Sequence, residues 1–185
     1  MPLTTKWFMI GRRMELPNIL GVLAQGTTED LEALTRLIDG FPEGRDDWGD
    51  PWIVDAVTYG SRAAVQWMIS RGVDLTVRDA TSCTVSHAAV EREEPDKYEI
   101  LDLLLRHGAP VNVRGWMGFE MTPAHLAVMH DDVEALRILV KYGADLSIKD
   151  GDFDGAPQTP LEYARSQQKA GVVEFLERLM RDSEP

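Results

Sequence analysis

The sequence predicts an all-α solenoid, in which short helix–turn–helix units of similar size stack on one another. The first observation is a repeated helix start, because Thr159-Pro160 follows Thr122-Pro123 after 37 residues and Thr84 lies 38 residues before Thr122. The second is a repeated stop, because Gly108 and Gly143 are 35 residues apart. Self-similarity at such a period is the sequence signature of a repeat architecture.

Each of these signals has a physical reason. Proline suits the first position of a helix because its missing N–H would be unsatisfied there in any case, and the preceding threonine can cap the helix. Glycine suits the left-handed position just past a helix end. Between Thr122-Pro123 and Gly143, the residues Val133, Leu136 and Leu139 form an apolar stripe at helical spacing. A unit of this size cannot bury both of its helices alone, so neighbouring copies are required.

The stretch Met121-Thr122-Pro123-Ala124-His125-Leu126-Ala127 resembles the core of the ankyrin repeat, which has a period of about 33 residues and a Thr-Pro-Leu-His-x-Ala motif. The resemblance covers the chain from about Pro17 to Met180. It implies a repeat domain over residues 17–182, preceded by an extension at 1–16 and followed by a tail at 183–185. The implied repeats span about 17–46, 47–79, 80–114, 115–149 and 150–182, and the first and last act as caps.

In chain order, the first repeat is expected to begin at Pro17, with Thr28 capping its second helix and Gly40 stopping it. In the second repeat, Pro51 opens the first helix and Gly60 separates the two helices. Both repeats carry apolar residues at helical spacing, which indicates that each helix has one buried face.

The third repeat begins at Thr84, and its inter-helix segment, Glu91–Lys97, is about three residues longer than the ankyrin pattern. Pro95 is expected in the first turn of its second helix. The connections 114–121 and 149–158 are also longer than the pattern. The resemblance implies that such connections form β-hairpin fingers.

The composition limits the classes of partner. The 185 residues carry a net charge of −12, with 31 acidic and 19 basic side chains. This balance argues against nucleic-acid binding and anionic membranes, and it favours either simple solubility or a basic protein partner. No apolar run approaches the ~20 residues of a membrane span. One cysteine permits no internal disulfide and fits a reducing compartment, so we expect a cytoplasmic protein. We also expect the protein to be monomeric in the free state.

Catalytic or metal-binding interpretations are weaker than structural ones. The resemblance implies that His87 and His125 tie neighbouring repeats together through hydrogen bonds to backbone and threonine. Cys83 lies four residues before His87, but nothing in the sequence indicates a lowered thiol pKa. We therefore expect no enzyme activity and no cofactor.

A calcium loop is the sharpest local alternative. Asp150, Asp152 and Asp154 occupy the first, third and fifth positions of a D-x-D-x-D-G pattern that Gly155 completes. Position 12, which needs a bidentate glutamate, is Leu161. The candidate metal site is therefore incomplete, and the plainer interpretation is an acidic finger.

The candidate partner-binding residues fall into two sets. Finger residues combine aromatic anchors with carboxylates, which is the chemistry that a basic partner requires; they are Trp48, Trp116, Met117, Phe119, Glu120, Asp152, Phe153 and Asp154. The alternative for Trp116 and Phe119 is packing of one finger on the next. The second set is implied by the ankyrin register at the ends of the first helices: Thr58, Tyr59, Glu91, Arg92, Met129, His130, Ser166 and Gln167.

The predicted function is therefore non-catalytic protein binding through a concave face and its fingers. The most specific form is an inhibitor or immunity-type protein that neutralises a basic enzyme or toxin. The alternative is a calcium-responsive regulator or a self-assembling scaffold.

Overall fold

The computed structural model describes residues 18–93, 95–116, 118–151 and 155–182. Across these ranges the secondary structure consists of ten α-helices, and strand pairing is limited to isolated bridges. The chain divides into two compact units, residues 1–74 and 75–185, which are described separately below as the N-terminal and C-terminal units. The predicted all-α repeat fold is confirmed.

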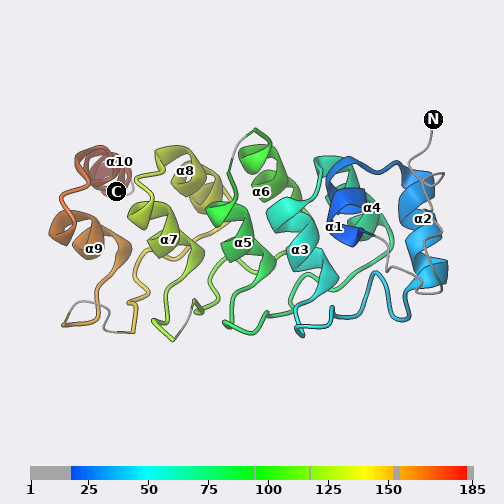
Figure 1. Cartoon of the computed structure of the whole chain (residues 1–185). Helices are drawn as coiled ribbons and strands as arrows, with labels where there is room; N and C mark the ends of the chain where they lie inside the picture. Colours follow the sequence, from blue (N-terminus) through cyan, green and yellow to red (C-terminus); the bar gives the residue numbers. More distant parts are fainter. Residues whose placement is uncertain (1–17, 94, 117, 152–154, 183–185) are drawn as a thin grey trace. The chain divides into compact units, whose positions relative to one another are not determined.

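The N-terminal unit contains two helix pairs (Figure 1). They are α1 (Ile19–Gln25) with α2 (Thr28–Leu37), and α3 (Trp52–Tyr59) with α4 (Arg62–Ser70). Helix α1 packs beside α3, and α2 packs beside α4. The core of the unit consists of fully buried apolar side chains that include Leu23, Leu31, Leu34, Ile53 and Met68. Burying each of these contributes about 1.5–3 kcal/mol relative to leaving it in water.

Two boundaries in the N-terminal unit differ from the sequence-based expectation. Thr27, and not Thr28, caps α2, because the Thr27 hydroxyl accepts the Asp30 N–H at 3.3 Å and the Thr27 N–H donates to the Asp30 carboxylate at 2.9 Å. Helix α2 then ends at Leu37, three residues before Gly40. The reciprocal capping box explains the choice of Thr27.

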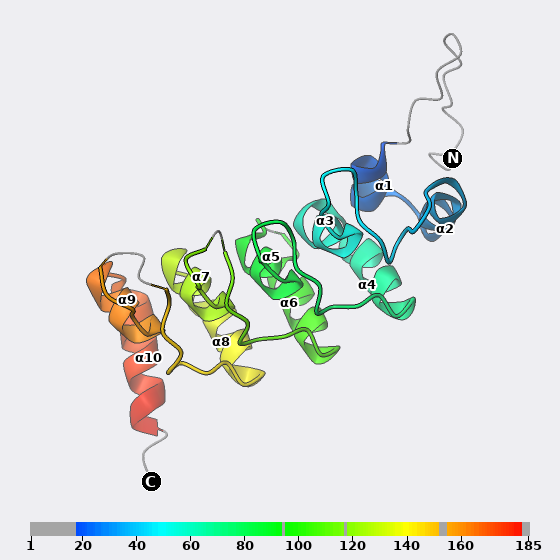
Figure 2. The same ribbon diagram turned by 90° about the horizontal axis from the view of Figure 1, so that it is seen from below.

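The C-terminal unit contains three helix pairs. They are α5 (Val85–Glu91) with α6 (Lys97–Arg106), α7 (Pro123–Met129) with α8 (Val133–Lys141), and α9 (Pro160–Ser166) with α10 (Ala170–Asp182). The first helices of the pairs pack in one layer, in the order α5, α7, α9, and the second helices pack in another, in the order α6, α8, α10 (Figure 2). The long connections before α7 and α9 project from one edge of these layers, while the α5–α6 connection lies at the opposite edge (Figure 1).

Proline takes the predicted first helical position in α7 and α9. Pro95 does not, because α6 begins at Lys97 and Asp96 is its N-cap residue. The segment between Gly115 and Met121 was expected to form a β-hairpin, and its described residues form a single antiparallel bridge between those two residues. Positive φ angles at Trp116 (72°) and Glu120 (54°) turn the chain between them, so the strand pairing does not continue. None of the described helices is both long and apolar enough to cross a bilayer.

Candidate functional site

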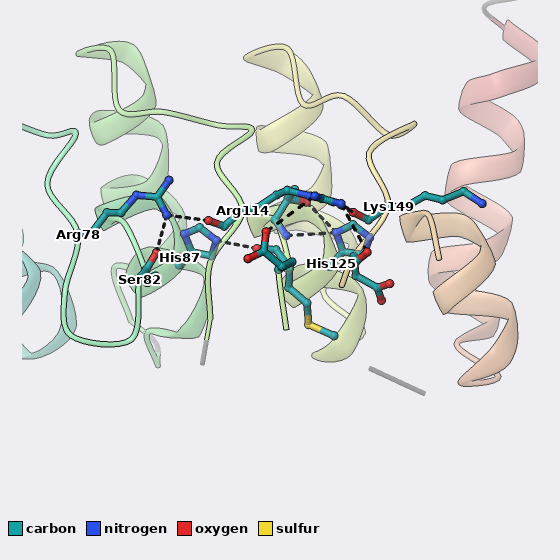
Figure 3. Close-up of polar contacts among 10 residues, drawn as sticks. Arg78, Ser82, His87, Arg114, His125 and Lys149 are labelled. Carbon is teal, nitrogen blue, oxygen red and sulfur yellow. Dashed lines mark hydrogen bonds and ion pairs between the residues drawn. The ribbon is translucent and has the colours of Figure 1, made fainter. Parts of the chain in front are cut away.

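Two buried histidines connect successive helix pairs of the C-terminal unit. The Nδ1 atom of His87 accepts the Thr84 N–H at 3.1 Å, and its Nε2 lies 3.1 Å from the Met121 carbonyl oxygen, to which it donates. His125 repeats the arrangement with Thr122 and the carbonyl of Gln158, at 3.2 and 3.0 Å. Both rings are fully buried. The predicted structural role of the two histidines is confirmed, and Figure 3 shows them in parallel positions.

Burial lowers the pKa of both rings. The pKa of His87 falls to about 4, and that of His125 is also lowered, because an imidazolium would lose its hydration in the core. Each ring is therefore neutral at pH 7, with the hydrogen on Nε2, which matches its donation to a carbonyl.

Besides the buried histidines, a series of exposed arginine hydrogen bonds also connects successive repeats of the same unit (Figure 3). The Arg78 guanidinium donates to the Arg114 carbonyl at 2.8 Å, and the Arg114 Nε donates to the Lys149 carbonyl at 3.1 Å. These bonds join residues 36 and 35 positions apart. Arginine donors thus satisfy backbone carbonyls of the irregular connections and fix where each connection starts.

The Cys83 and His87 pair does not have the features of a nucleophile and its base. Cys83 is buried, and burial raises the pKa of its thiol to about 11. Both ring nitrogens of His87 already have backbone partners. A thiolate at neutral pH is therefore disfavoured at this position.

Asp150 has a structural role. Its carboxylate is buried and accepts the Gln158 N–H at 2.8 Å, while its own N–H donates to the Gln158 carbonyl at 2.9 Å. Asp152 and Asp154 lie outside the described residues. Among the residues that are described, no group of three histidine, cysteine or carboxylate side chains is placed to hold a metal ion.

In the N-terminal unit, the connection 41–51 forms a short finger with Trp48 at its tip. Trp48 is 84% exposed. The Asp46 carboxylate accepts the N–H groups of Trp48 and Asp50 at 2.9 and 2.8 Å, and an Arg45–Pro51 bridge closes the base. The finger backbone is thus held by its own hydrogen bonds, while the indole faces solvent.

The base of this finger is apolar and its flank is acidic. Phe41 is buried against Trp52 and Trp67, with ring centroids 5.8 and 6.0 Å away. On α3, Asp55 is half-buried, and desolvation together with the nearby charges of Asp46 and Asp50 raises its pKa to about 6. Burial is the main cause of this shift, and the carboxylates of Asp46 and Asp50 add negative charge on the same flank of the Trp48 finger.

The corresponding finger of the C-terminal unit holds its tryptophan differently. Trp116 is half-buried, its ring centroid lies 5.4 Å from that of Phe119, and its indole N–H donates to the Glu91 carboxylate at 2.9 Å. Glu120 is exposed, within 3.8 Å of Arg114. Two of the residues proposed for partner binding, Trp116 and Glu91, therefore contact each other.

The helix-end positions form a second candidate area in the C-terminal unit. Glu91, Arg92 and His130 line one groove of about 540 Å³, together with residues that were not among the candidate partner-binding residues: Val90, Glu93, Lys97, Tyr98 and the run 131–134. Within this lining, the Lys97 ammonium lies 2.6 Å from the Asp132 carboxylate, and both side chains are about nine-tenths buried. Lys97 ends the long Glu91–Lys97 segment noted in the sequence, but its pairing with Asp132 was not predicted, because the two residues are 35 positions apart.

The remaining candidates are dispersed. Tyr59 is 60% exposed at the end of α3, whereas Thr58 donates to the Val54 carbonyl at 2.9 Å. Met129 is half-buried, and Ser166 and Gln167 are exposed at the end of α9. Met117, Asp152, Phe153 and Asp154 lie outside the described residues. The structure thus joins three of the proposed helix-end residues in the groove and gives Trp48 the largest exposure among its large apolar side chains that are described.

Comparison with known proteins places this geometry in a family. A family model described as ankyrin repeats (3 copies) matches residues 52–150 and 87–182. Similar proteins include alpha-latrotoxin-Lg1a of Latrodectus geometricus, which is 31% identical over 123 residues, covering 66% of this chain and 8% of the toxin. A fowlpox virus protein named for its ankyrin repeats is 30% identical over 65% of this chain and 35% of its own length.

A Rickettsia felis protein, also named for ankyrin repeats, is 27% identical over 72% of this chain and 43% of its own length. The chain therefore spans less than half of each of these three relatives. The family match alone covers most of the residues that the structure describes, and the histidine-linked helix pairs agree with it. The chain belongs to the ankyrin repeat family, and its repeats make it a protein–protein interaction module.

Proposed function

We propose that this chain is a non-catalytic binding protein for a basic protein partner and that the Trp48 finger is its principal contact. The observation that carries the proposal is the 84% exposure of Trp48 on a finger with a fixed backbone. Tryptophan is enriched among the residues that dominate binding energy, and a pre-ordered loop loses little entropy when it docks.

Charge supports a basic partner. Asp46, Asp47 and Asp50 surround Trp48 in the sequence, Asp55 lies on the adjoining helix, and the whole chain carries −12. A partner with a positive surface would associate quickly through electrostatic steering, and the association would weaken as salt increases.

We propose, more specifically, that the partner is a basic enzyme such as a nuclease or a toxin, which this chain inhibits in the cytoplasm as an immunity-type protein. The net charge supports this choice, because it is opposite to that of proteins that bind nucleic-acid phosphates. The non-catalytic role is supported by the burial of the Cys83 thiol and by the ring of His87, both nitrogens of which are hydrogen-bonded to backbone groups.

The calcium-responsive and scaffold alternatives are separate hypotheses. The carboxylate of Asp150 already accepts a backbone N–H, which does not favour a calcium role. A rise in thermal stability with millimolar calcium would support such a role. If light scattering shows a monomer at high protein concentration, the hypothesis of a self-assembling scaffold is contradicted.

The test is a pull-down from the native host with the full chain and two variants. Trp48→Ala removes the proposed anchor, and Met180→Ala removes an apolar side chain of C-terminal helix α10 that is 55% exposed. We expect a basic protein on the wild-type and Met180→Ala chains and its loss from Trp48→Ala. Equal recovery by all three chains would contradict the role of the finger.

A further inference from the structure

The groove between the α5–α6 connection and the α7–α8 turn has the size of a ligand site and an uneven distribution of charge. Its volume of about 540 Å³ lies in the range of small-ligand pockets. Its described lining includes five carboxylates and two cationic side chains, a balance of −3, not counting His130. The carboxylates are Glu91, Glu93, Asp131, Asp132 and Glu134, and the cations are Arg92 and Lys97.

Both cations are turned inward and compensated. The Lys97 ammonium contacts Asp132, whose carboxylate also accepts the Tyr98 hydroxyl at 3.2 Å and the Ala135 N–H at 2.9 Å. The Arg92 side chain is 10% exposed and lies 4.0 Å from Asp96. Asp132 is therefore already paired, and the two positive charges contribute little to the accessible surface of the groove.

Three other carboxylates of the groove lining are accessible. Glu93, Asp131 and Glu134 are all exposed. Glu134 shares a surface ion pair of 3.2 Å with Arg137, and such exposed pairs contribute about 0–1 kcal/mol. Among the described residues, the carboxylates of Glu93 and Asp131 have no hydrogen-bonding or ionic partner. The same lining includes the apolar side chains of Val90 and Val133 and the ring of Tyr98.

This combination matches one kind of occupant. A lysine or arginine side chain has an apolar stem, which packs on aliphatic and aromatic walls, and a cationic head, which binds carboxylates. We propose that the groove docks a lysine or arginine side chain of an extended segment from a protein partner. The inference rests on the proposed function in that the partner is a basic protein, but its site lies in the C-terminal unit and uses none of the Trp48 finger.

The test titrates the ¹⁵N-labelled full chain with a hexa-arginine peptide and follows the backbone NMR signals. A groove variant carries Glu93→Gln, Asp131→Asn and Glu134→Gln. Asparagine is suitable at position 131 because the backbone there has a φ of 55°, which asparagine tolerates. A control variant carries Glu29→Gln, Glu99→Gln and Glu174→Gln, which are exposed outside the groove and give the same net charge.

We expect signal changes concentrated at residues 90–98 and 130–134, an affinity at least fivefold lower in the groove variant, and a change of less than twofold in the control variant. Trp48→Ala should leave this peptide binding unchanged, which separates the groove from the finger. Equal losses in the two triple variants, signal changes spread over the acidic surface, or loss of binding in Trp48→Ala would each overturn the proposal.

Discussion

The two described finger tryptophans, Trp48 and Trp116, illustrate how one residue type takes opposite roles in this chain. Trp48 in the N-terminal unit is 84% exposed, and its finger is held by backbone hydrogen bonds, by the Asp46 carboxylate and by the Arg45 guanidinium, which donates to the Gly49 carbonyl. Trp116 in the C-terminal unit packs on Phe119 and donates to Glu91. The indole of Trp48 faces solvent, whereas the indole of Trp116 makes contacts within the C-terminal unit.

The difference shows that an aromatic finger is not in itself a binding site. The finger of Trp116 is also held at its base, because the Met121 carbonyl accepts the His87 Nε2–H and the Gly115 N–H. A Cβ atom on Gly115 would lie 2.3 Å from the Ser82 carbonyl oxygen, so this backbone is tightly packed. Trp116 therefore contributes to the cohesion of the C-terminal unit, whereas partner contact by Trp48 is the proposal that the following experiments test.

The largest effect on stability should come from removing the histidine below the Trp116 finger. His87→Ala leaves the buried N–H of Thr84 without its acceptor and opens a cavity, so the free energy of unfolding of the C-terminal unit should fall by about 3 kcal/mol. Urea unfolding followed by NMR signals from each unit measures this change. His130→Ala, at an exposed position, is the control and should change the value by less than about 0.5 kcal/mol. A similar loss in both variants would contradict the assignment.

Acid should change the stability of the two units in opposite directions, because the shifted pKa values of His87 and Asp55 have opposite effects on the free energy of unfolding. The folded pKa of His87 is about 4, below the unfolded value near 6.5, so stability of the C-terminal unit is present above pH 6.5 and is lost as pH falls towards 4. The loss should be on the order of 1–3 kcal/mol. Asp55 has a raised folded pKa of about 6, so its contribution stabilises the N-terminal unit as pH falls from 7 to 4.

Unfolding of each unit at pH 7 and pH 4.5 tests these signs. Asp55→Asn should remove the gain in the N-terminal unit without altering the acid sensitivity of the C-terminal unit. Parallel pH profiles in the two units of the unmodified chain would show that these groups do not set the pH dependence.

Trp116→Ala should destabilise the C-terminal unit by about 1–2 kcal/mol, because it removes both the contact with Phe119 and the hydrogen bond to Glu91. Trp48→Ala removes an exposed side chain and should change stability by less than about 0.5 kcal/mol. Thermal unfolding of the two variants beside the unmodified chain gives the comparison. If Trp48→Ala proved the more destabilising, the indole of Trp48 would have internal contacts, against the present assignment.

The smallest expected effect is at the charged residues of the two fingers. Asp47 is exposed beside Trp48, and Asp47→Asn should weaken binding of the basic partner by about 0.2–1 kcal/mol, with less dependence on salt. Glu120→Gln makes the same change of charge on the Trp116 finger and should leave the affinity unchanged. Calorimetric titrations at two salt concentrations distinguish the outcomes. Equal effects would indicate that overall charge, and not the Trp48 finger, attracts the partner.

Local signals in the sequence were sufficient for the fold. Thr122-Pro123 and Thr159-Pro160 start helices as predicted, because capping and the fixed φ of proline depend only on neighbouring residues. Pro95 was misplaced, since Asp96 takes the N-cap position and α6 begins only after it. The difference between Trp48 and Trp116 could not be predicted, because the partner of Trp116 is 25 residues away at the end of α5. The Lys97–Asp132 pair in the groove was missed for the same reason.

The most direct test of the central claim measures the dissociation constant of the basic partner for three full-length chains at one salt concentration: unmodified, Trp48→Ala and Trp116→Ala. Truncation of an anchor residue costs about 2 kcal/mol or more, which corresponds to an affinity at least about 30-fold lower. We predict this loss for Trp48→Ala and a change of less than about twofold for Trp116→Ala. Equal affinities for Trp48→Ala and the unmodified chain, or a larger loss for Trp116→Ala, would contradict the account.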